Sequence, residues 1–386
     1  MKKNRLIDLR HRLHKNAEIS GQENNTADII ISYLTTLNPD KIVTELGTGN
    51  GIAAVFDSAV QGPTIMIRGE LDALPIKEEN NIEYISVRSG VSHVCGHDGH
   101  MTILCGLAEK LSKYKQRYQG KAIVLFQPAE ETAAGAKDLM SDEHFHQLEA
   151  DFIIGFHNIP GFQLGTLLVK KDVFSVASQG LIIRLHGQTS HAGDPDKGKN
   201  PMNSLIKIVQ SIQKISELYH SNYPQTFITI IHLKLGEVAF GTNPGEAILM
   251  ATLRSSKDGV IEKMSSEIIR MVEQTMSNYD IDWCHEWVEI FPALVNSEEN
   301  LADVIYAANE LKLPVRELVN PFSWSEDFSY FQQKYPSVFF GIGSGIHQPA
   351  LHHNSYDFPD DLIPIGLDLC FEIICQSSKR PKEWFK

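Results

Sequence analysis

The sequence predicts an α/β protein whose first domain is interrupted by a second, smaller one. Three apolar, strand-like segments in the N-terminal half are each followed directly by polar residues, as strands of a partly parallel sheet often are. Farther along, the pattern becomes strand–helix–strand–strand–helix–strand, the ferredoxin-like order, and helices and strands alternate again afterwards. We therefore expect one domain built from residues 1–176 and 292–386, with residues 177–291 inserted into it.

The first domain is expected to begin with two helices and to continue as a sheet. Its elements are two helices within 4–38, strands at 42–46, 52–56 and 64–68, a helix over 98–117, and strands at 121–127 and 152–156. Pro75 stops regular structure soon after the third strand, so Glu70 and Asp72 fall at its carboxyl end. Because ligand sites of open α/β sheets lie at the carboxyl ends of strands, polar residues after three of these strands are expected at one site.

The inserted domain is expected to contain four strands and two helices. The strands fall at 180–185, 226–235, 247–254 and 281–290, and the helices at 201–219 and 258–278. The first domain then resumes with a helix near 298–311, a strand at 337–342 and a helix at 364–377.

Composition excludes several classes of function. The chain has 386 residues and a formal net charge of −13, with no run of Lys and Arg, so neither nucleic acid nor an anionic membrane is an expected partner. The spacing of Leu6, Leu9 and Leu13 indicates an amphipathic helix rather than a signal peptide, and no apolar stretch is as long as a membrane span. The five cysteines are scattered, which favours reduced thiols in the cytoplasm.

One short stretch, SHVCGHDGH at residues 92–100, concentrates groups that bind metals. It contains one thiol, three imidazoles and one carboxylate, with two glycines that let the backbone bend. Cys95 and His97 lie two residues apart, a spacing that suits one Zn²⁺ or Mn²⁺ ion if the loop is extended.

Polar residues elsewhere could complete this site. The candidate ligands are Cys95, His97, Glu131, His157 and either His352 or His353. Five ligands are more than one catalytic zinc ion needs, whereas two ions roughly 3.5–4 Å apart that share a water would use them all. Such a pair requires a general base beside that water, and Glu130, next to Glu131, is the natural candidate.

Each candidate also has an ordinary explanation when taken alone. A single histidine is most often structural or solvated, Glu130 and Glu131 could simply begin a helix, and Cys95 could be a small buried hydrophobe. Their joint placement in loops that one sheet could bring together favours the metal site. The histidines without such partners are interpreted as ordinary: His11, His14, His144, His146, His186, His220, His232 and His285.

A series of motifs extends over nearly the whole chain. In order, they are RGELDALPI (68–76), CGHDGH (95–100), QPAEE (127–131), GFHNIP (155–160), GQTSHA (187–192), the segment 247–254, SEDF (325–328) and LHHNSYDF (351–358). With these motifs the chain resembles the aminoacylase/carboxypeptidase G group of two-metal amidohydrolases. It is most similar to the branch of hippurate hydrolases, N-acetyldiaminopimelate deacetylases and plant auxin-conjugate hydrolases.

The resemblance implies a fold and a ligand set. The fold is a zinc-exopeptidase-like mixed sheet flanked by helices, with the ferredoxin-like (βαββαβ) insertion as a lid that is often used for dimerisation. Two divalent metal ions are implied, Mn²⁺ or Zn²⁺ with Co²⁺ or Ni²⁺ as alternatives, and their ligands are Cys95, His97, Glu131, His157 and a C-terminal histidine. The family's last ligand precedes an aromatic-Asp-Phe run by four residues, which selects His352 because that run begins at Tyr356.

The resemblance also implies roles around the metals. Glu130 is the general base, His191 contacts the carbonyl or carboxylate of the substrate, and Arg254 binds its carboxylate in a bidentate manner. Asp98, next to His97, is expected to orient a ligand.

The chain departs from the family pattern in three places. Glu70 stands where the family often has Asp, Asp194-Pro195-Asp196 replaces a common Pro-His, and Gly241 takes the place of an Asn, with Asn243 as its neighbour. The last two changes concern the substrate side and leave the ligand set intact, so the chemistry is better defined than the substrate.

We therefore expect a cytoplasmic, metal-dependent hydrolase that cleaves the amide bond of an N-acyl amino acid, assembled as a homodimer or tetramer through the lid. A dipeptidase with the same site is the nearest alternative. A thiol hydrolase with Cys95 as nucleophile would leave Glu131 and His352 without a role, and a non-catalytic carboxylate-binding protein would not need Glu130.

Overall fold

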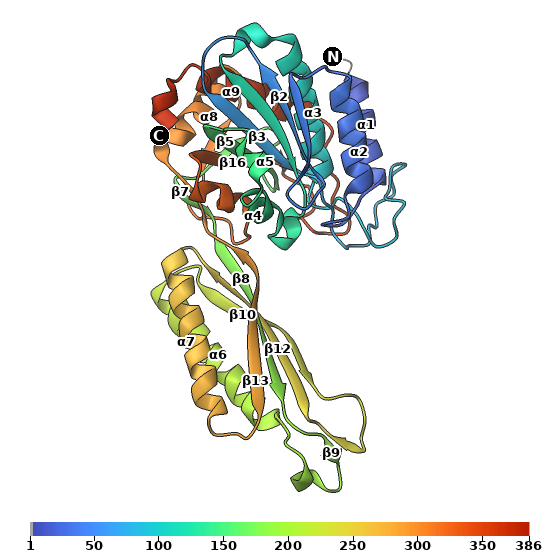
Figure 1. Ribbon diagram of the computed structural model, residues 1–386, viewed down its shortest axis with the longest axis vertical. Coiled ribbons are helices and arrows are strands. Elements are labelled where there is room, and N and C mark those ends of the chain that lie inside the picture. Colours follow the sequence, from blue (N-terminus) through green and yellow to red (C-terminus); the bar gives the residue numbers. More distant parts are fainter. Residues whose placement is uncertain (1–2, 386) are drawn as a thin grey trace. The chain divides into compact units, whose positions relative to one another are not determined.

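The computed structural model describes residues 3–385, with the side chains of residues 3, 4 and 258 left out. The chain forms two compact units (Figure 1). The first unit contains the chain up to Phe174, Val295–Asn320 and the residues from Asp327 onward, and the second contains Ser175–Leu294 and Pro321–Glu326.

The first unit is a mixed sheet with helices packed on it. Its helices are α1 (Lys3–Lys15), α2 (Asn24–Thr35), α3 (His97–Lys113), α4 (Gly135–Leu139), α5 (Glu143–His146), α8 (Glu298–Glu310) and α9 (Leu362–Ser377). Its sheet contains β1 (Lys41–Leu46), β2 (Gly51–Asp57), β3 (Thr64–Glu70), β4 (Lys121–Gln127), β5 (Phe152–Pro160), β6 (Leu167–Val169), β15 (Val315–Glu317) and β16 (Ser337–Gly345). β7 (Asp172–Ser175) and β14 (Leu294–Asn296) form a separate pair, and each contains a boundary between the units.

The strand order of this sheet is β1-β2-β4-β3-β5-β16-β6-β15. The central strands β4, β3, β5 and β16 are parallel to their neighbours in this group, whereas β1, β2 and β6 add antiparallel pairs. Glu70 pairs with Gln127, so the carboxyl ends of β3 and β4 meet at one edge. The predicted mixed α/β sheet, with polar residues gathered at the ends of its parallel strands, is therefore confirmed.

Apolar strands and amphipathic helices explain how this unit is held together. Every residue of β3 is buried, as expected for a central strand covered on both faces. α3 packs against β2, β3 and β4 and also contacts α1 and α9 (Figure 1). The contact is close at Gly69, where a Cβ atom would lie 2.9 Å from Leu104 of α3, so glycine lets the helix approach the strand.

Some details of the sheet differ from the sequence-based prediction. His157 and Asn158 lie within β5, whereas we expected the strand to end at Phe156. The extension pairs with β16, which continues alongside β5 to Pro160. The strands β6 and β15 were not predicted, because each has only three residues and shows no periodicity.

The second unit has the predicted ferredoxin-like order. Its elements are β8 (Ala177–His186), β9 (Ser190–His191), α6 (Met202–Asn222), β10 (Phe227–Leu235), β11 (Thr242–Asn243), β12 (Glu246–Ser255), α7 (Asp258–Met276) and β13 (Asp282–Phe291). The antiparallel sheet has the order β10-β12-β8-β13, and α6 and α7 pack against it (Figure 1). β9 and β11 form a small two-stranded ribbon of their own.

None of the helices within residues 3–385 combines the length and the apolar character of a membrane span.

Candidate metal centre

The five predicted ligands lie together in the first unit. Cys95 lies two residues before α3 and His97 begins it, Glu131 lies in the 3-10 helix η2 (Glu130–Thr132) after β4, His157 is in β5, and His352 follows β16. Their donor atoms form two overlapping groups, Cys95 with His97 and His157, and Cys95 with Glu131 and His352. Within each group the donor atoms lie within 4.8 Å of one another. Segments that are far apart in the sequence therefore contribute to a single cluster.

The distances between donor atoms suit metal coordination. The Sγ of Cys95 lies 3.4 Å from Nε2 of His157, and Oε1 of Glu131 lies 3.6 Å from Nε2 of His352 and 3.9 Å from Nε2 of His97. A tetrahedral ion with bonds of about 2.0–2.3 Å separates its donors by about 3.3–3.8 Å. Among residues 3–385, the buried Nε2 of His97 has no hydrogen-bond partner, which suits a nitrogen that binds a metal ion.

Unusual backbone conformations occur at and beside the predicted ligands. Gly96 has φ 99°, and a Cβ atom there would lie 2.5 Å from Oδ1 of Asn158, so the turn between the thiol and the first imidazole requires glycine. Ala129 and Ala133, on either side of η2, have φ 53° and 58°, and His352 has φ 66°. Such left-handed conformations cost about 1–3 kcal/mol each in non-glycine residues and concentrate at functional sites.

Asp72 ties two of the predicted ligands together. The Nδ1–H of His97 donates to the carbonyl oxygen of Asp72 at 2.8 Å, which directs Nε2 toward the cluster. The carboxylate of Asp72 accepts hydrogen bonds from the backbone N–H of Glu131 at 3.0 Å and from Ser20 Oγ at 2.7 Å. A backbone carbonyl or carboxylate behind a metal-binding histidine commonly fixes the orientation of the ring in this way.

A buried charged network lies beside this cluster. The guanidinium of Arg68 contacts the carboxylates of Glu70 and Asp327, the latter at 2.5 Å, and donates to Gln127 at 2.8 Å. Glu70 also lies 2.5 Å from Nδ1 of His100, and Gln127 donates to Asp327 at 2.7 Å. Arg68 therefore compensates two carboxylates that would be costly to bury alone.

The electrostatics of the cluster favour cations. Burial raises the pKa of the Cys95 thiol well above its usual range, and nearby glutamates led by Glu131 raise it further. Burial alone lowers the pKa of His97, but the hydrogen bond with Asp72 and the charges of Glu70, Asp72 and Glu131 together raise it to about 10. Negative charge from the neighbouring carboxylates contributes to both shifts, and a divalent cation would neutralise it.

The pKa of His157 is shifted in the opposite direction to that of His97. Burial holds the pKa of His157 well below its ordinary value, and the neighbouring His100 and His97 lower it further. Its Nδ1–H donates to the carbonyl oxygen of Asn158 at 2.8 Å, so the lone pair of Nε2 faces Cys95. A neutral imidazole with a fixed tautomer is the form that binds metals.

The two predicted substrate contacts lie in the second unit, at opposite ends of its sheet. His191 is exposed in β9, beyond the end of β8, and pairs with Thr242. Arg254 pairs with Ser178 at the other end of β8, and partial burial lowers the pKa of its guanidinium. Because β8 runs on from Ser178 to His186, about 26 Å of strand separates the two positions. One chain therefore does not bring His191 and Arg254 together.

Asn243 holds the loop that carries His191. Its Nδ2 donates to Ser190 Oγ at 3.0 Å and to the carbonyl oxygen of Pro195 at 3.3 Å, and its Oδ1 accepts from Asn200 at 2.8 Å. The amide is thus engaged within its own loop, which gives Asn243 a structural part in placing His191.

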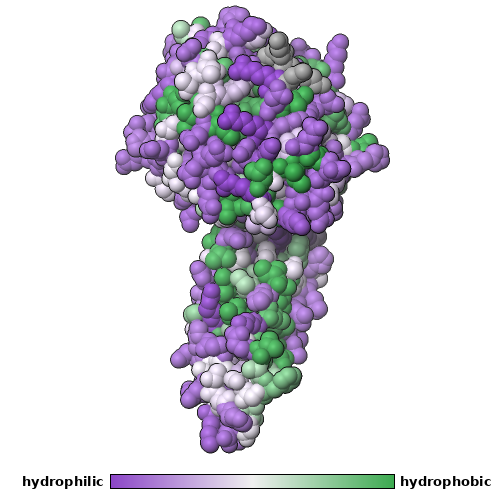
Figure 2. Space-filling view, turned by 90° about the vertical axis from the view of Figure 1, so that its right-hand side faces the viewer, coloured by the Kyte–Doolittle hydropathy of each residue, from purple (hydrophilic) through white to green (hydrophobic). Residues whose placement is uncertain are grey.

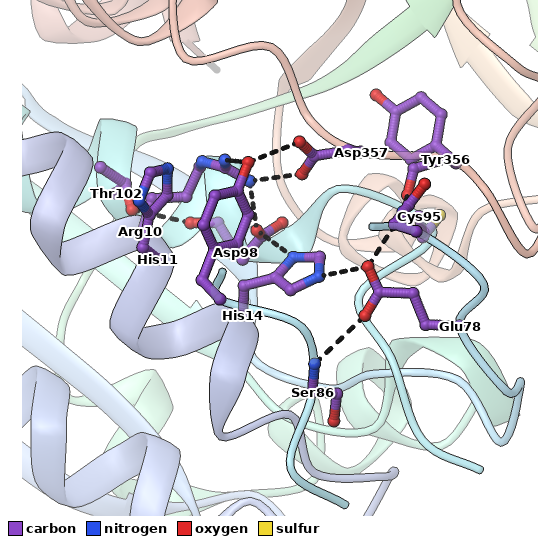
Figure 3. Close-up of polar contacts among 12 residues, drawn as sticks. Arg10, His11, His14, Glu78, Ser86, Cys95, Asp98, Thr102, Tyr356 and Asp357 are labelled. Carbon is purple, nitrogen blue, oxygen red and sulfur yellow. Dashed lines mark hydrogen bonds and ion pairs between the residues drawn. The ribbon is translucent and has the colours of Figure 1, made fainter. Parts of the chain in front are cut away.

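Asp98 has different partners from those that we expected. Its carboxylate lies 3.0 Å from a guanidinium nitrogen of Arg10 and 2.9 Å from Nδ1 of His14, both on α1 (Figure 3). The carboxylate beside the predicted ligand His97 is that of Asp72 instead. His14, which we interpreted as an ordinary histidine, is fully buried between the carboxylates of Asp98 and Glu78.

The sequence led us to expect Asp72 near the site without a role of its own, and it gave no role to His100, Arg10 or His14. Asp72 follows Glu70 at the end of a strand, and this position was a usable signal. Arg10 and His14 are four residues apart on one face of α1, which also could have drawn attention to them.

Several known proteins resemble this chain in sequence or in fold. The model of the family "Peptidase family M20/M25/M40" matches residues 66–376. Two Bacillus subtilis relatives are each 28% identical to this chain: an N-acetylcysteine deacetylase, with 94% of both chains covered, and an N-acetyl-L-cysteine deacetylase, with 93% of this chain and 84% of the relative covered. The crystal structure of the Bacillus subtilis YXEP protein, described as a dinuclear metal binding peptidase, has a TM-score of 0.81 at 24% identity, with 97% of both chains covered. This likeness confirms the fold.

Proposed function

The chain belongs to peptidase family M20/M25/M40 and is a metal-dependent amidohydrolase, and from this premise we propose that it uses two metal ions to hydrolyse the amide bond of N-acyl amino acids. The observation that carries the proposal is the convergence of Cys95, His97, Glu131, His157 and His352 in two donor groups that share Cys95. The ligand count suits a pair of ions better than a single one. YXEP, with the same fold, is described as dinuclear.

The chemistry divides between the ions and Glu130. Two ions held by these five residues would polarise the substrate carbonyl and lower the pKa of a water molecule at the site. Glu130 is buried beside Glu131, and its carboxylate takes the proton from this water as the water oxygen attacks the carbonyl carbon. Glu130 then delivers the proton to the amine nitrogen as the C–N bond breaks, which leaves a free carboxylate and a free amine.

Two kinds of observation support an acyl amino acid as the substrate. Relatives at 28% identity are N-acetylcysteine deacetylases, whose substrates carry an acylated nitrogen and a carboxylate. Arg254 offers a guanidinium for that carboxylate, and its Nη1 is held by the carbonyl oxygen of Ser323 at 2.9 Å. His191 supplies a second polar contact.

A dimer would allow His191 and Arg254 to contact the same substrate molecule. Because His191 and Arg254 lie about 26 Å apart along the sheet of one chain, a single small substrate that touches both must receive them from two chains. β10 is an edge strand that exposes Ile231 and Leu233, and Figure 2 shows apolar residues on the surface of this unit. Pairing of β10 with a second copy would bury this edge. The lid role of the second unit is part of the same proposal.

The thiol-hydrolase alternative finds no support in the surroundings of Cys95. A nucleophilic cysteine needs a lowered pKa, whereas burial and neighbouring glutamates raise the pKa of Cys95. The same thiol becomes a ligand as soon as a cation offsets that charge.

The test is amine release from N-acetyl, N-benzoyl and indole-acyl amino acids and from dipeptides, with Mn²⁺-, Zn²⁺-, Co²⁺- or Ni²⁺-loaded protein compared with chelated protein. Metal-dependent release from an acyl amino acid supports the proposal, whereas release from dipeptides alone would replace it by a dipeptidase. Glu130→Gln should keep both ions and lose about 10²–10⁴-fold in kcat. Glu143→Gln, an exposed carboxylate on α5, is the matched control and should remain active. Full activity of Glu130→Gln would remove Glu130 from its role as general base.

A further inference from the structure

Helix α1 carries a buried cationic cluster that the proposed reaction does not use. Arg10 and His14 point from one face of this helix toward Asp98 and other acidic groups (Figure 3). Neither side chain is exposed to solvent. Two cations buried side by side require strong partners, because isolated buried charges are very costly.

All three nitrogen atoms of the Arg10 guanidinium donate hydrogen bonds. Nη1 donates to Asp98 at 3.0 Å and to Asp357 at 2.9 Å, Nε donates to Asp360 at 2.5 Å, and Nη2 donates to Tyr84 at 2.8 Å. The hydroxyl of Tyr84 in turn donates to Asp357 at 2.6 Å, so the two groups hold the same carboxylate.

These contacts connect the two chain segments that carry predicted ligands. Asp98 comes directly after His97, in the first turn of α3. Asp357 and Asp360 belong to the loop that leads from His352 to α9. One guanidinium on α1 therefore joins a segment near residue 97 to a segment near residue 352.

The His352 segment needs such a connection more than the other ligands do. Cys95 and His97 are fixed by α3, and His157 is fixed within β5, whereas His352 lies in a loop and its side chain is 50% exposed. A backbone bond from the N–H of His352 to the carbonyl oxygen of Val94 at 2.9 Å is a second link between the segments. The loop has no strand or helix of its own between β16 and α9.

We propose that Arg10 is a positioning residue that sets the distance between the Cys95–His97 segment and the His352 segment, and thereby the affinity of the centre for its metal ions. The inference rests on the proposed two-metal function. Without the guanidinium, Asp98 would keep only His14 as a cationic partner and Asp357 would lose its contact with Arg10, so nothing would hold the two carboxylates together and their repulsion would move the segments apart. A lysine cannot replace it, because one ammonium does not match several acceptors in fixed directions.

The test compares metal binding by Arg10→Gln, Arg10→Lys and the full-length wild-type protein. Competition with a chromophoric chelator gives the affinity for Mn²⁺ and Zn²⁺ without any use of substrate. We expect Arg10→Gln to bind at least one ion about 10–100-fold more weakly, the usual effect of removing an outer contact of a metal site. Arg10→Lys should recover only part of this loss, and excess metal should restore activity in both variants.

Arg380→Gln is the matched control. Arg380 makes a bidentate ion pair with the buried carboxylate of Asp303, at 2.7 and 2.9 Å, away from the segments that carry predicted ligands. This variant should lose stability and keep wild-type metal affinity. If Arg10→Gln does not fold, Asp357→Asn tests the same link, because it removes one carboxylate and leaves the contact between Arg10 and Asp98 intact.

The possible outcomes separate the two proposals. Wild-type protein that binds two ions, together with folded Arg10→Gln or Asp357→Asn of unchanged affinity, would overturn the positioning role and leave the proposed function standing. Wild-type protein that does not bind two ions would overturn the proposed function and the inference with it. If the wild-type protein binds two ions but cleaves no acyl amino acid, only the proposed substrate would be wrong. Weaker metal binding by the variants would still support the role of Arg10.

Discussion

His14 should make the stability of the first unit depend on pH. Its Nδ1 lies 2.9 Å from Asp98 and its Nε2 lies 3.0 Å from Glu78, so each ring nitrogen faces a carboxylate (Figure 3). Burial alone would lower the pKa of His14, but the hydrogen bonds and charges of Asp98 and Glu78 together raise it to about 9 from an ordinary 6.5. The folded protein therefore holds this proton more tightly than the unfolded chain does.

The sign and size of the effect follow from this difference. Because the pKa of the folded state is the higher one, the stabilisation is complete below pH 6.5 and is lost as the pH rises to about 9. A difference from 6.5 to about 9 corresponds to about 3 kcal/mol, since one pH unit is about 1.4 kcal/mol. The ring is fully buried, so solvent does not screen the interaction.

The assay is urea unfolding of chelator-treated protein followed by circular dichroism, at several pH values between about 6 and 9. We expect His14→Gln to be about 3 kcal/mol less stable than wild type at the acidic end, with a gap that nearly closes at the alkaline end. His144→Gln, which alters an exposed histidine, is the control and should follow the wild-type curve. A gap between wild type and His14→Gln that stays constant with pH would refute this reasoning.

Two further predictions concern packing and loop order. Gly99→Ala should lower the free energy of unfolding by about 1–3 kcal/mol, because the added Cβ atom would lie 2.3 Å from the ring of Phe358, and an unchanged urea midpoint would contradict it. Asn243→Ala should accelerate amide hydrogen exchange in the loop around His191 while leaving the circular dichroism spectrum unchanged, because three hydrogen bonds of that loop are lost. Equal exchange rates in both proteins would assign the order of the loop to other contacts.

Local patterns explain why much of the fold could be predicted. β4 was predicted with the bounds that the structure has, because an apolar run followed by Pro128 has a clear end. The ferredoxin-like unit was recognisable because each of its strands and helices is long enough to show its own periodicity. The ribbon of β9 and β11 was not recognisable, because two residues per strand are too few to show a periodicity.

The candidate site could be predicted only in part. Cys95 and His97 stand in one short motif, so their proximity was readable from the sequence. Arg10 meets Asp360 across 350 positions, and nothing in α1 indicates which distant carboxylate it will contact. Asp98 was given the wrong partner for the same reason, because adjacency to His97 says nothing about the direction of its side chain.

The spread of the ligands along the chain has a consequence for biosynthesis. At about 5–20 residues per second, roughly ten to fifty seconds separate the synthesis of Cys95 from that of His352. During this interval most of the second unit, Ser175–Leu294, is made, while the proposed metal centre still lacks its last ligand and the carboxylates that Arg10 holds. A nascent chain thus presents an incomplete thiol-containing site, and all five predicted ligands could hold the two proposed metal ions only after nearly the whole chain has left the ribosome.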